Sequence, residues 1–323
     1  MRILSGMRPT GRLHLGHLSV LENWLRLQDD NECFFFVADW HAFTTEYENP
    51  RDIKNFTYQM VGDWLAVGID PEKSVVFVQS EIPEHAELHL IFSMFTPLSW
   101  LERVPTYKDQ VRKLAEQGKD ITTYGFLGYP LLQAADILIY LAEGVPVGED
   151  QLPHIELCRE VARRFNHLYA PIFPEPQGIL AEIKLVPGID GQKMSKSYHN
   201  EIPLITTAQE ISRLIHMMVT DPARIHKDDL GHPEVCTVFK YHEIYNNAVG
   251  EIEAACRAGK IGCVACKKRL ADIAEGILGP IRQRRAELAS RKGHIEEVLH
   301  LGRQKARLIA SATLEKVRAA LNL

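Results

Sequence analysis

The chain lacks long apolar runs, internal repeats and low-complexity segments. Among its 323 residues, no stretch approaches the roughly 20 consecutive apolar positions that a membrane-spanning helix needs. The apolar run at the start is also too short for a secretory signal, because it soon reaches Arg8 and Arg12. These absences exclude membrane-spanning and secreted classes, and they predict a globular protein of the cytoplasm with about two domains.

The chain has fewer positively than negatively charged residues, with 37 Lys and Arg residues against 42 Asp and Glu residues and a net charge of −5. This balance argues against a protein that binds nucleic acid over most of its surface, but it leaves room for a local basic patch. Between Arg282 and Arg318, ten basic residues outnumber four acidic ones in a stretch with helical periodicity. That stretch is therefore either a nucleic-acid contact or a solvated helix face.

Two short motifs, far apart in the chain, carry the chemistry. The first is PTGRLHLGH, at Pro9–His17, and the second is KMSKS, at Lys193–Ser197. In the first, His14 and His17 share one face where a strand turns into a helix, and helix N-termini favour phosphate. Gly16 lets a base or ribose approach the backbone, and the lysines of the second motif suit a triphosphate. Either motif alone is commonly an ordinary helix start or a solvated loop, but together they predict two halves of one ATP site.

The first half of the chain alternates apolar runs with helical periodicity. The expected strands are Arg2–Ser5, Cys33–Ala38, Val75–Gln79 and Val145–Val147, and the expected helices between them are Leu18–Gln28, Ile53–Val67 and Pro130–Tyr140. This alternation predicts an α/β fold with a doubly wound, parallel, Rossmann-like sheet. Ligands of such sheets bind beyond the carboxyl ends of the strands, where the first motif is expected.

The second half is expected to be helical. Residues 1–200 are predicted to form the Rossmann-like domain, with an insertion at about 80–128, and residues 201–323 a helical domain whose last helix could pack back on the first domain. The helices expected there are Ile211–Val219, His242–Ala254, Lys267–Gln283 and Gly293–Leu321.

Three polar side chains are spaced to meet on one helix face. Tyr129, Gln133 and Asp136 stand at i, i+4 and i+7, and Pro130 is compatible with the first turn of a helix. Hydroxyl, amide and carboxylate groups are therefore predicted to converge on one spot, as a small polar ligand requires.

At these motifs the chain resembles the class I aminoacyl-tRNA synthetases. The segments at 129–138 and 145–151 are similar to those of bacterial tryptophanyl-tRNA synthetases, and the similarity extends over nearly the whole chain. The resemblance implies ATP-dependent activation of L-tryptophan to tryptophanyl-adenylate, followed by transfer to the 3′ end of its tRNA. It also implies an anticodon-binding role for the helical domain and a homodimer formed through the insertion, which is too short for an editing domain.

The resemblance further implies a set of site residues. The catalytic residues that contact the phosphates and the leaving pyrophosphate, with Mg²⁺ alongside, are His14, His17, Lys193 and Lys196. ATP would also contact Arg8, Pro9, Thr10, Gly16, Gly148, Glu149, Asp150, Val186, Met194, Ser195 and Ser197. Tryptophan would contact Leu4, His41, Tyr129, Gln133, Asp136, Val145, Val147 and Gln151, with the aspartate accepting from the indole N–H. Gln133 stands where many relatives have Met, and His41 could equally be a satisfied, half-buried histidine.

Four of the six cysteines are grouped. Cys236, Cys256, Cys263 and Cys266 follow the spacing C-x19-C-x6-C-x2-C, and a cytoplasmic location disfavours disulfides. The spacing permits tetrahedral zinc or a [4Fe–4S] cluster. A subset of tryptophanyl-tRNA synthetases carries such a cluster on a similar pattern, so the resemblance implies the cluster, with zinc as the alternative.

Three other functions remain as alternatives. A tyrosyl-tRNA synthetase of the same class would also use polar partners, but the Ala134-Ala135-Asp136 context and the helical C-terminal part favour tryptophan. A small-molecule nucleotidylyltransferase shares the first motif but not the complete KMSKS run. A synthetase-like tRNA-binding protein without charging activity would tend to lose the histidines or lysines that are present here.

Overall fold

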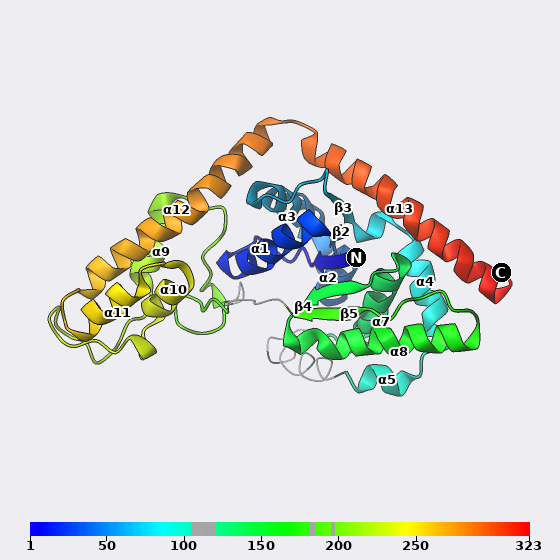
Figure 1. Cartoon of the computed structure of the whole chain (residues 1–323), viewed down its shortest axis with the longest axis horizontal. Coiled ribbons are helices and arrows are strands. Elements are labelled where there is room, and N and C mark those ends of the chain that lie inside the picture. Colours follow the sequence, from blue (N-terminus) through cyan, green and yellow to red (C-terminus); the bar gives the residue numbers. More distant parts are fainter. Residues whose placement is uncertain (105–110, 112–115, 117–119, 181–184, 195–197) are drawn as a thin grey trace.

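The computed structural model describes residues 1–104, 111, 116, 120–180, 185–194 and 198–323. In this part of the chain, five strands form one parallel sheet in the order β3-β2-β1-β4-β5 (Figure 1). The strands are β1 (Arg2–Met7), β2 (Glu32–Val37), β3 (Ser74–Val78), β4 (Gly144–Val147) and β5 (Gln177–Leu180). With helices on both faces, this sheet confirms the predicted Rossmann-like class.

The inner strand β2 shows why the sequence forms such a sheet. Its residues after Glu32 are all buried, as expected for a parallel strand covered on both faces. Alternate side chains face opposite sides, so Phe35 stacks on Trp24 at 4.4 Å while Phe34 stacks on Tyr140 at 5.1 Å. The sheet therefore separates two hydrophobic cores. Strand β5 was not predicted, because it is short, lies at the sheet edge and is only partly buried.

The helices around the sheet hold the site from several directions. They are α1 (Leu15–Asp30), α2 (Asp39–Glu46), α3 (Ile53–Val67), α4 (Glu84–Ser93), α5 (Leu98–Glu102), α7 (Tyr124–Ile139) and α8 (Leu152–Leu168). Helix α7 begins before the predicted Pro130, because the Thr123 hydroxyl caps it by accepting from the backbone N–H of Phe126. The prediction that Pro130 lies in the first turn is therefore wrong, and this proline lies inside the helix.

The C-terminal part is helical, as predicted. Its helices are α9 (Ala208–Met217), α10 (Thr237–Tyr245), α11 (Val249–Arg257), α12 (Cys263–Ser290) and α13 (His294–Leu321). The expected single helix His242–Ala254 is instead α10 and α11, because the Asn246 side chain accepts the backbone N–H of Ala248 in the turn between them. None of the helices within the described residues has the length and apolar character that a membrane crossing requires.

The last two helices connect the C-terminal helices to the sheet. Helix α12 packs on α9 and α3, and α13 runs back along the edge strand β3 (Figure 1). Several basic residues between Arg282 and Arg318 hold α12 and α13 against the rest of the protein. Arg285 pairs with Asp63 at 3.1 Å, and Arg318 pairs with Glu87 at 2.6 Å. Arg282, Arg284 and Arg307 likewise bond to Glu275, to the carbonyl of Ala66 and to Glu84. Much of the predicted basic patch is therefore structural.

Gly302 sets how closely α13 approaches β3. A Cβ at this position would lie 1.8 Å from the carbonyl oxygen of Val76, far inside van der Waals contact with backbone that cannot rotate away. We expect Gly302→Ala to lower the free energy of unfolding by roughly 1–3 kcal/mol, as overpacking typically does. The measurement is urea unfolding followed by circular dichroism.

Gly276 provides the matched control, because it lies inside the other long helix with nothing within 4 Å of an added Cβ. Gly276→Ala should raise the unfolding free energy by roughly 0.5–1 kcal/mol through helix propensity. Equal effects of the two substitutions would contradict the close approach of α13 to β3.

Candidate functional site

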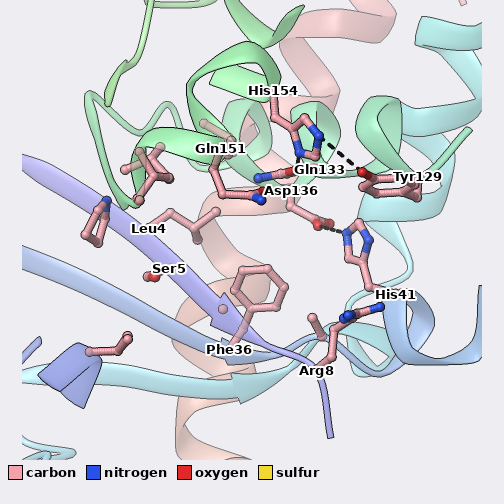
Figure 2. A pocket seen from close by; sticks show the side chains of 18 of the residues that line it. Leu4, Ser5, Arg8, Phe36, His41, Tyr129, Gln133, Asp136, Gln151 and His154 are labelled. Carbon is pink, nitrogen blue, oxygen red and sulfur yellow. Dashed lines mark hydrogen bonds and ion pairs between the residues drawn. The ribbon is translucent and has the colours of Figure 1, made fainter. Parts of the chain in front are cut away.

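A cavity of about 370 Å³ opens at the carboxyl ends of β1 and β4 (Figure 2). It is enclosed by these strands together with α2, α7 and α8, as expected for a doubly wound sheet. The predicted residues that line it are Leu4, Arg8, His41, Tyr129, Gln133, Asp136, Val145, Val147, Gly148 and Gln151. Phe36, Phe126 and His154 also line it but were not predicted.

Asp136 lies in the wall of this cavity, only 1% exposed. His41 Nε2 lies 2.8 Å from Oδ2 and His85 Nδ1 lies 2.6 Å from Oδ1. The amide of Gln79 donates to both oxygens, at 2.8 and 3.0 Å. Burial alone would raise the pKa of the Asp136 carboxyl, but the hydrogen bonds and charges of the two histidines outweigh it and lower the pKa to about 2. The group is therefore an ionised acceptor in a fixed orientation.

His85 and Gln79 were not predicted. Gln79 follows directly on β3, and His85 stands in the first turn of α4, where its Nε2 lies 2.7 Å from the hydroxyl of Tyr140. The only sequence signal was that Gln79 stands at the end of a predicted strand. Since carboxyl ends of parallel strands share one rim, that position could have been included in the site.

A second hydrogen-bonded group joins two of the predicted residues (Figure 2). His154 Nε2 lies 3.1 Å from the hydroxyl of Tyr129, and its Nδ1 lies 2.9 Å from Oε1 of Gln133. Burial lowers the pKa of His154 to about 4, against the opposing influence of Asp150. The imidazole is therefore neutral at neutral pH.

The first ATP motif forms the start of α1. His14 is the residue before the helix, and its backbone N–H donates to Nδ1 of His17 at 3.1 Å. The centroids of the two rings lie 3.9 Å apart, with the ring planes tilted by 50°. Both imidazoles therefore lie at the N-terminus of α1, the end of the helix that carries partial positive charge.

Met194, in the described part of the KMSKS motif, lies beside this helix start. A Cβ added to Gly16 would lie 3.1 Å from the His14 ring and 3.7 Å from Sδ of Met194. The chain just after the motif also pairs with the first motif, since the N–H of Leu15 donates to the carbonyl of Ile202 at 2.8 Å. Lys193 is exposed, whereas the predicted Ser195, Lys196 and Ser197 lie outside the described residues. The structure thus brings the ends of the two motifs together.

The other predicted ATP contacts are spread over nearby turns. Gly148 precedes a short helical turn at Glu149–Gln151 and lines the cavity, and Oδ2 of Asp150 accepts from the side chain of Gln151 at 3.0 Å. Pro9 is buried and Thr10 is partly buried in the turn before the first motif. The side chain of Val186 is 7% exposed and belongs to the hydrophobic core, so its backbone is the part available to a ligand.

The four grouped cysteines meet in the C-terminal helices. Cys236, Cys256, Cys263 and Cys266 all line one narrow cavity. Burial raises the pKa of the Cys266 thiol to about 12, and its three neighbouring cysteines add to this effect. Among the residues that the structure describes, however, no group of three or more His, Cys, Asp or Glu side chains is placed to hold a metal ion.

Comparisons with known proteins place the chain in one family. The family model for class I tRNA synthetases (W and Y) matches residues 1–279. The tryptophan–tRNA ligase of Thermotoga maritima is 53% identical, covering 100% of this chain and 99% of the relative. The tryptophan–tRNA ligase of Aquifex aeolicus is 46% identical, with 100% of both chains covered. The crystal structure of tryptophanyl-tRNA synthetase from Campylobacter jejuni, in complex with ADP and tryptophan, matches 100% of both chains with a TM-score of 0.90 and 33% identity.

Proposed function

We propose a mode of amino-acid binding and activation for this chain, which belongs to the class I tRNA synthetases for tryptophan and tyrosine. Its activity is that of a tryptophan–tRNA ligase, an enzyme that binds ATP and L-tryptophan and acts on tRNA.

Tryptophan is proposed to occupy the cavity of Figure 2, with its indole N–H directed at Asp136. The indole N–H only donates, so an ionised, acceptor-only carboxylate is its natural partner. The fixed and ionised state of Asp136 is the observation that carries this proposal. His41, which lines the cavity and contacts Oδ2, would share that oxygen with the indole. Leu4, Val145 and Val147 supply the apolar wall.

ATP is proposed to bind between the two motifs. His14 and His17, at the positive end of the α1 dipole, would hold the phosphates. Gly148, Glu149 and Asp150 would contact the ribose. Lys193 and Lys196 would take up the charge of the leaving pyrophosphate. Mg²⁺ in such sites is held largely by substrate phosphates, whose charge it neutralises. Because a carboxylate is already ionised, attack of tryptophan on the α-phosphorus needs no general base, and catalysis rests on positioning and charge stabilisation.

One assay tests the amino-acid assignment. Purified protein should catalyse ATP–pyrophosphate exchange that depends on tryptophan, and it should charge tRNA with tryptophan. Exchange supported by tyrosine instead would favour the alternative within the family. Exchange without tRNA charging would favour the nucleotidylyltransferase reading, and tRNA binding without exchange would favour a non-catalytic protein.

The four cysteines are proposed to hold a [4Fe–4S] cluster. Tetrahedral zinc, held by four sulfurs at about 2.3 Å from one ion, is the alternative. A cluster binds each cysteine to a different iron, so its ligands stand further apart, in keeping with four thiols around one cavity. When bound, it would tie the start of α10 to α11 and α12.

We expect Cys263→Ser to abolish stoichiometric binding of iron and acid-labile sulfide and to lower the melting temperature. Tryptophan-dependent exchange per folded molecule should stay within about twofold, since these residues do not line the cavity of Figure 2. Cys158→Ala, a buried cysteine outside the group, should leave iron binding unchanged. Zinc in place of iron in anaerobically purified protein, or unchanged iron in Cys263→Ser, would contradict the cluster.

The assembly and location are also inferred. Four large apolar side chains are exposed on the segment that begins the predicted insertion and on the start of α7, namely Leu90, Met94, Leu98 and Tyr124. Exposed apolar side chains such as these favour a homodimer through residues 80–128, and a monomer mass in light scattering at micromolar concentration would contradict it. The helical part after residue 200 is proposed to bind the anticodon of tRNA(Trp), and the enzyme is expected in the cytoplasm, where tRNA is charged.

A further inference from the structure

His154 lies in the wall of the cavity of Figure 2, almost fully buried against the two residues that it contacts. It stands in the first turn of α8, is 2% exposed, and lies against two residues of α7 that are one turn apart. Its two ring nitrogens contact the hydroxyl of Tyr129 and the amide oxygen of Gln133 (Figure 2). Both partners line the cavity in which the amino acid is proposed to bind.

The partners of His154 assign its tautomer. A neutral imidazole has one donor and one acceptor nitrogen, and an amide oxygen only accepts. Nδ1 therefore carries the proton and donates to Gln133, so Nε2 is an acceptor and the Tyr129 hydroxyl donates to it. Burial, which lowers the pKa of His154 to about 4, keeps the ring in this neutral state.

This arrangement decides which atoms the cavity offers to a ligand. Tyr129 directs its proton to His154, so its oxygen is oriented as an acceptor. The side-chain oxygen of Gln133 accepts the hydrogen bond from His154, and its amide nitrogen makes no hydrogen bond to any described residue. In the reversed tautomer, Nε2 would donate to the Tyr129 oxygen and Nδ1 would accept from the Gln133 amide. The cavity would then present the Tyr129 hydroxyl as a donor beside the Gln133 amide oxygen.

We propose that His154 is a positioning residue that prepares the cavity for the zwitterionic end of the amino acid. Tyr129 presents an acceptor for the α-ammonium, and Gln133 presents a donor for the α-carboxylate, which is the attacking group. This inference rests on the proposed function, and it gives Gln133, which was predicted only as a tryptophan contact, the role of orienting the carboxylate.

His154→Phe tests the proposal because it keeps a ring in place while removing both hydrogen bonds. In tryptophan-dependent pyrophosphate exchange, KM for tryptophan should rise about tenfold, while KM for ATP stays within about twofold. Competitive inhibition by indole, which lacks both the ammonium and the carboxylate, should change by less than about twofold. His154→Asn, whose amide can replace one of the two bonds, should give an intermediate KM.

Two further variants keep the test decisive. His167→Phe alters an exposed histidine of the same helix and should leave every constant unchanged. If His154→Phe does not fold, Tyr129→Phe should raise KM for tryptophan but not the inhibition constant of indole. Equal losses for indole and tryptophan, or an unchanged KM for tryptophan, would overturn the proposal. Failure of the wild-type protein to catalyse tryptophan-dependent exchange would instead speak against the proposed function.

Discussion

Replacement of Asp136 by asparagine is expected to lower kcat/KM for tryptophan on the order of 10²-fold in pyrophosphate exchange. The carboxylate accepts from His41, His85 and Gln79 at 2.6–3.0 Å, and every one of these contacts requires an acceptor. An asparagine has only one oxygen, so its NH₂ group must face at least one of these donors. The indole N–H would also lose its charged partner.

The magnitude follows from hydrogen-bond energetics. A hydrogen bond to a charged group contributes about 1.5–3 kcal/mol, and a tenfold change in rate corresponds to about 1.4 kcal/mol. The loss should fall on kcat/KM for tryptophan, while KM for ATP changes little, because Asp136 lines the cavity that is proposed to bind the amino acid.

Asp221→Asn is the matched control for this experiment. Asp221 is also a buried carboxylate bonded to a histidine, His232 at 2.9 Å, but it lies in the C-terminal helical part beside the cysteines. We expect it to reduce stability while exchange per folded molecule stays within about twofold. Similar losses of kcat/KM in both variants would show that Asp136 acts through stability alone, and wild-type activity of Asp136→Asn would remove the indole assignment.

Replacement of Lys196 by alanine is expected to slow adenylate formation on the order of 10²-fold or more, a typical loss for a group that stabilises charge in the transition state. Negative charge moves onto the leaving pyrophosphate as the bond to the α-phosphorus breaks, so the lysine should act mainly on kcat. KM for tryptophan should change by less than about threefold. The neighbouring Met194, close to Gly16, places the start of this motif beside the helix that would hold the phosphates.

Lys316→Ala controls for the loss of one positive charge. Lys316 is exposed on α13, which does not line the cavity of Figure 2, so exchange should stay within about twofold. An unchanged pre-steady-state rate of adenylate formation in Lys196→Ala would end its assignment to the leaving group.

Most of the fold could be predicted from the sequence. Apolar runs such as Cys33–Val37 in β2 are buried on both faces, so hydrophobicity alone reveals them. Helix α3 was predicted with its observed bounds, Ile53–Val67, because its periodic apolar positions pack on the sheet and Gly68 ends it. The helix bounds that were predicted wrongly are those that a single polar contact sets. The Thr123 hydroxyl caps α7 ahead of its predicted start, and the Asn246 side chain stabilises the turn that separates α10 from α11.

By itself, the sequence determined the class of sheet, the two ATP motifs and the helix face that carries Tyr129 and Asp136, because these depend on local spacing and on side-chain chemistry. Only the tertiary structure decided what these groups contact. His85 and Gln79 come from segments far from Asp136 in the chain, and His154 comes from the helix beside Tyr129. The physical reason is that a parallel sheet gathers the carboxyl ends of its strands at one rim, so the donors around a buried carboxylate are chosen by strand order and helix packing.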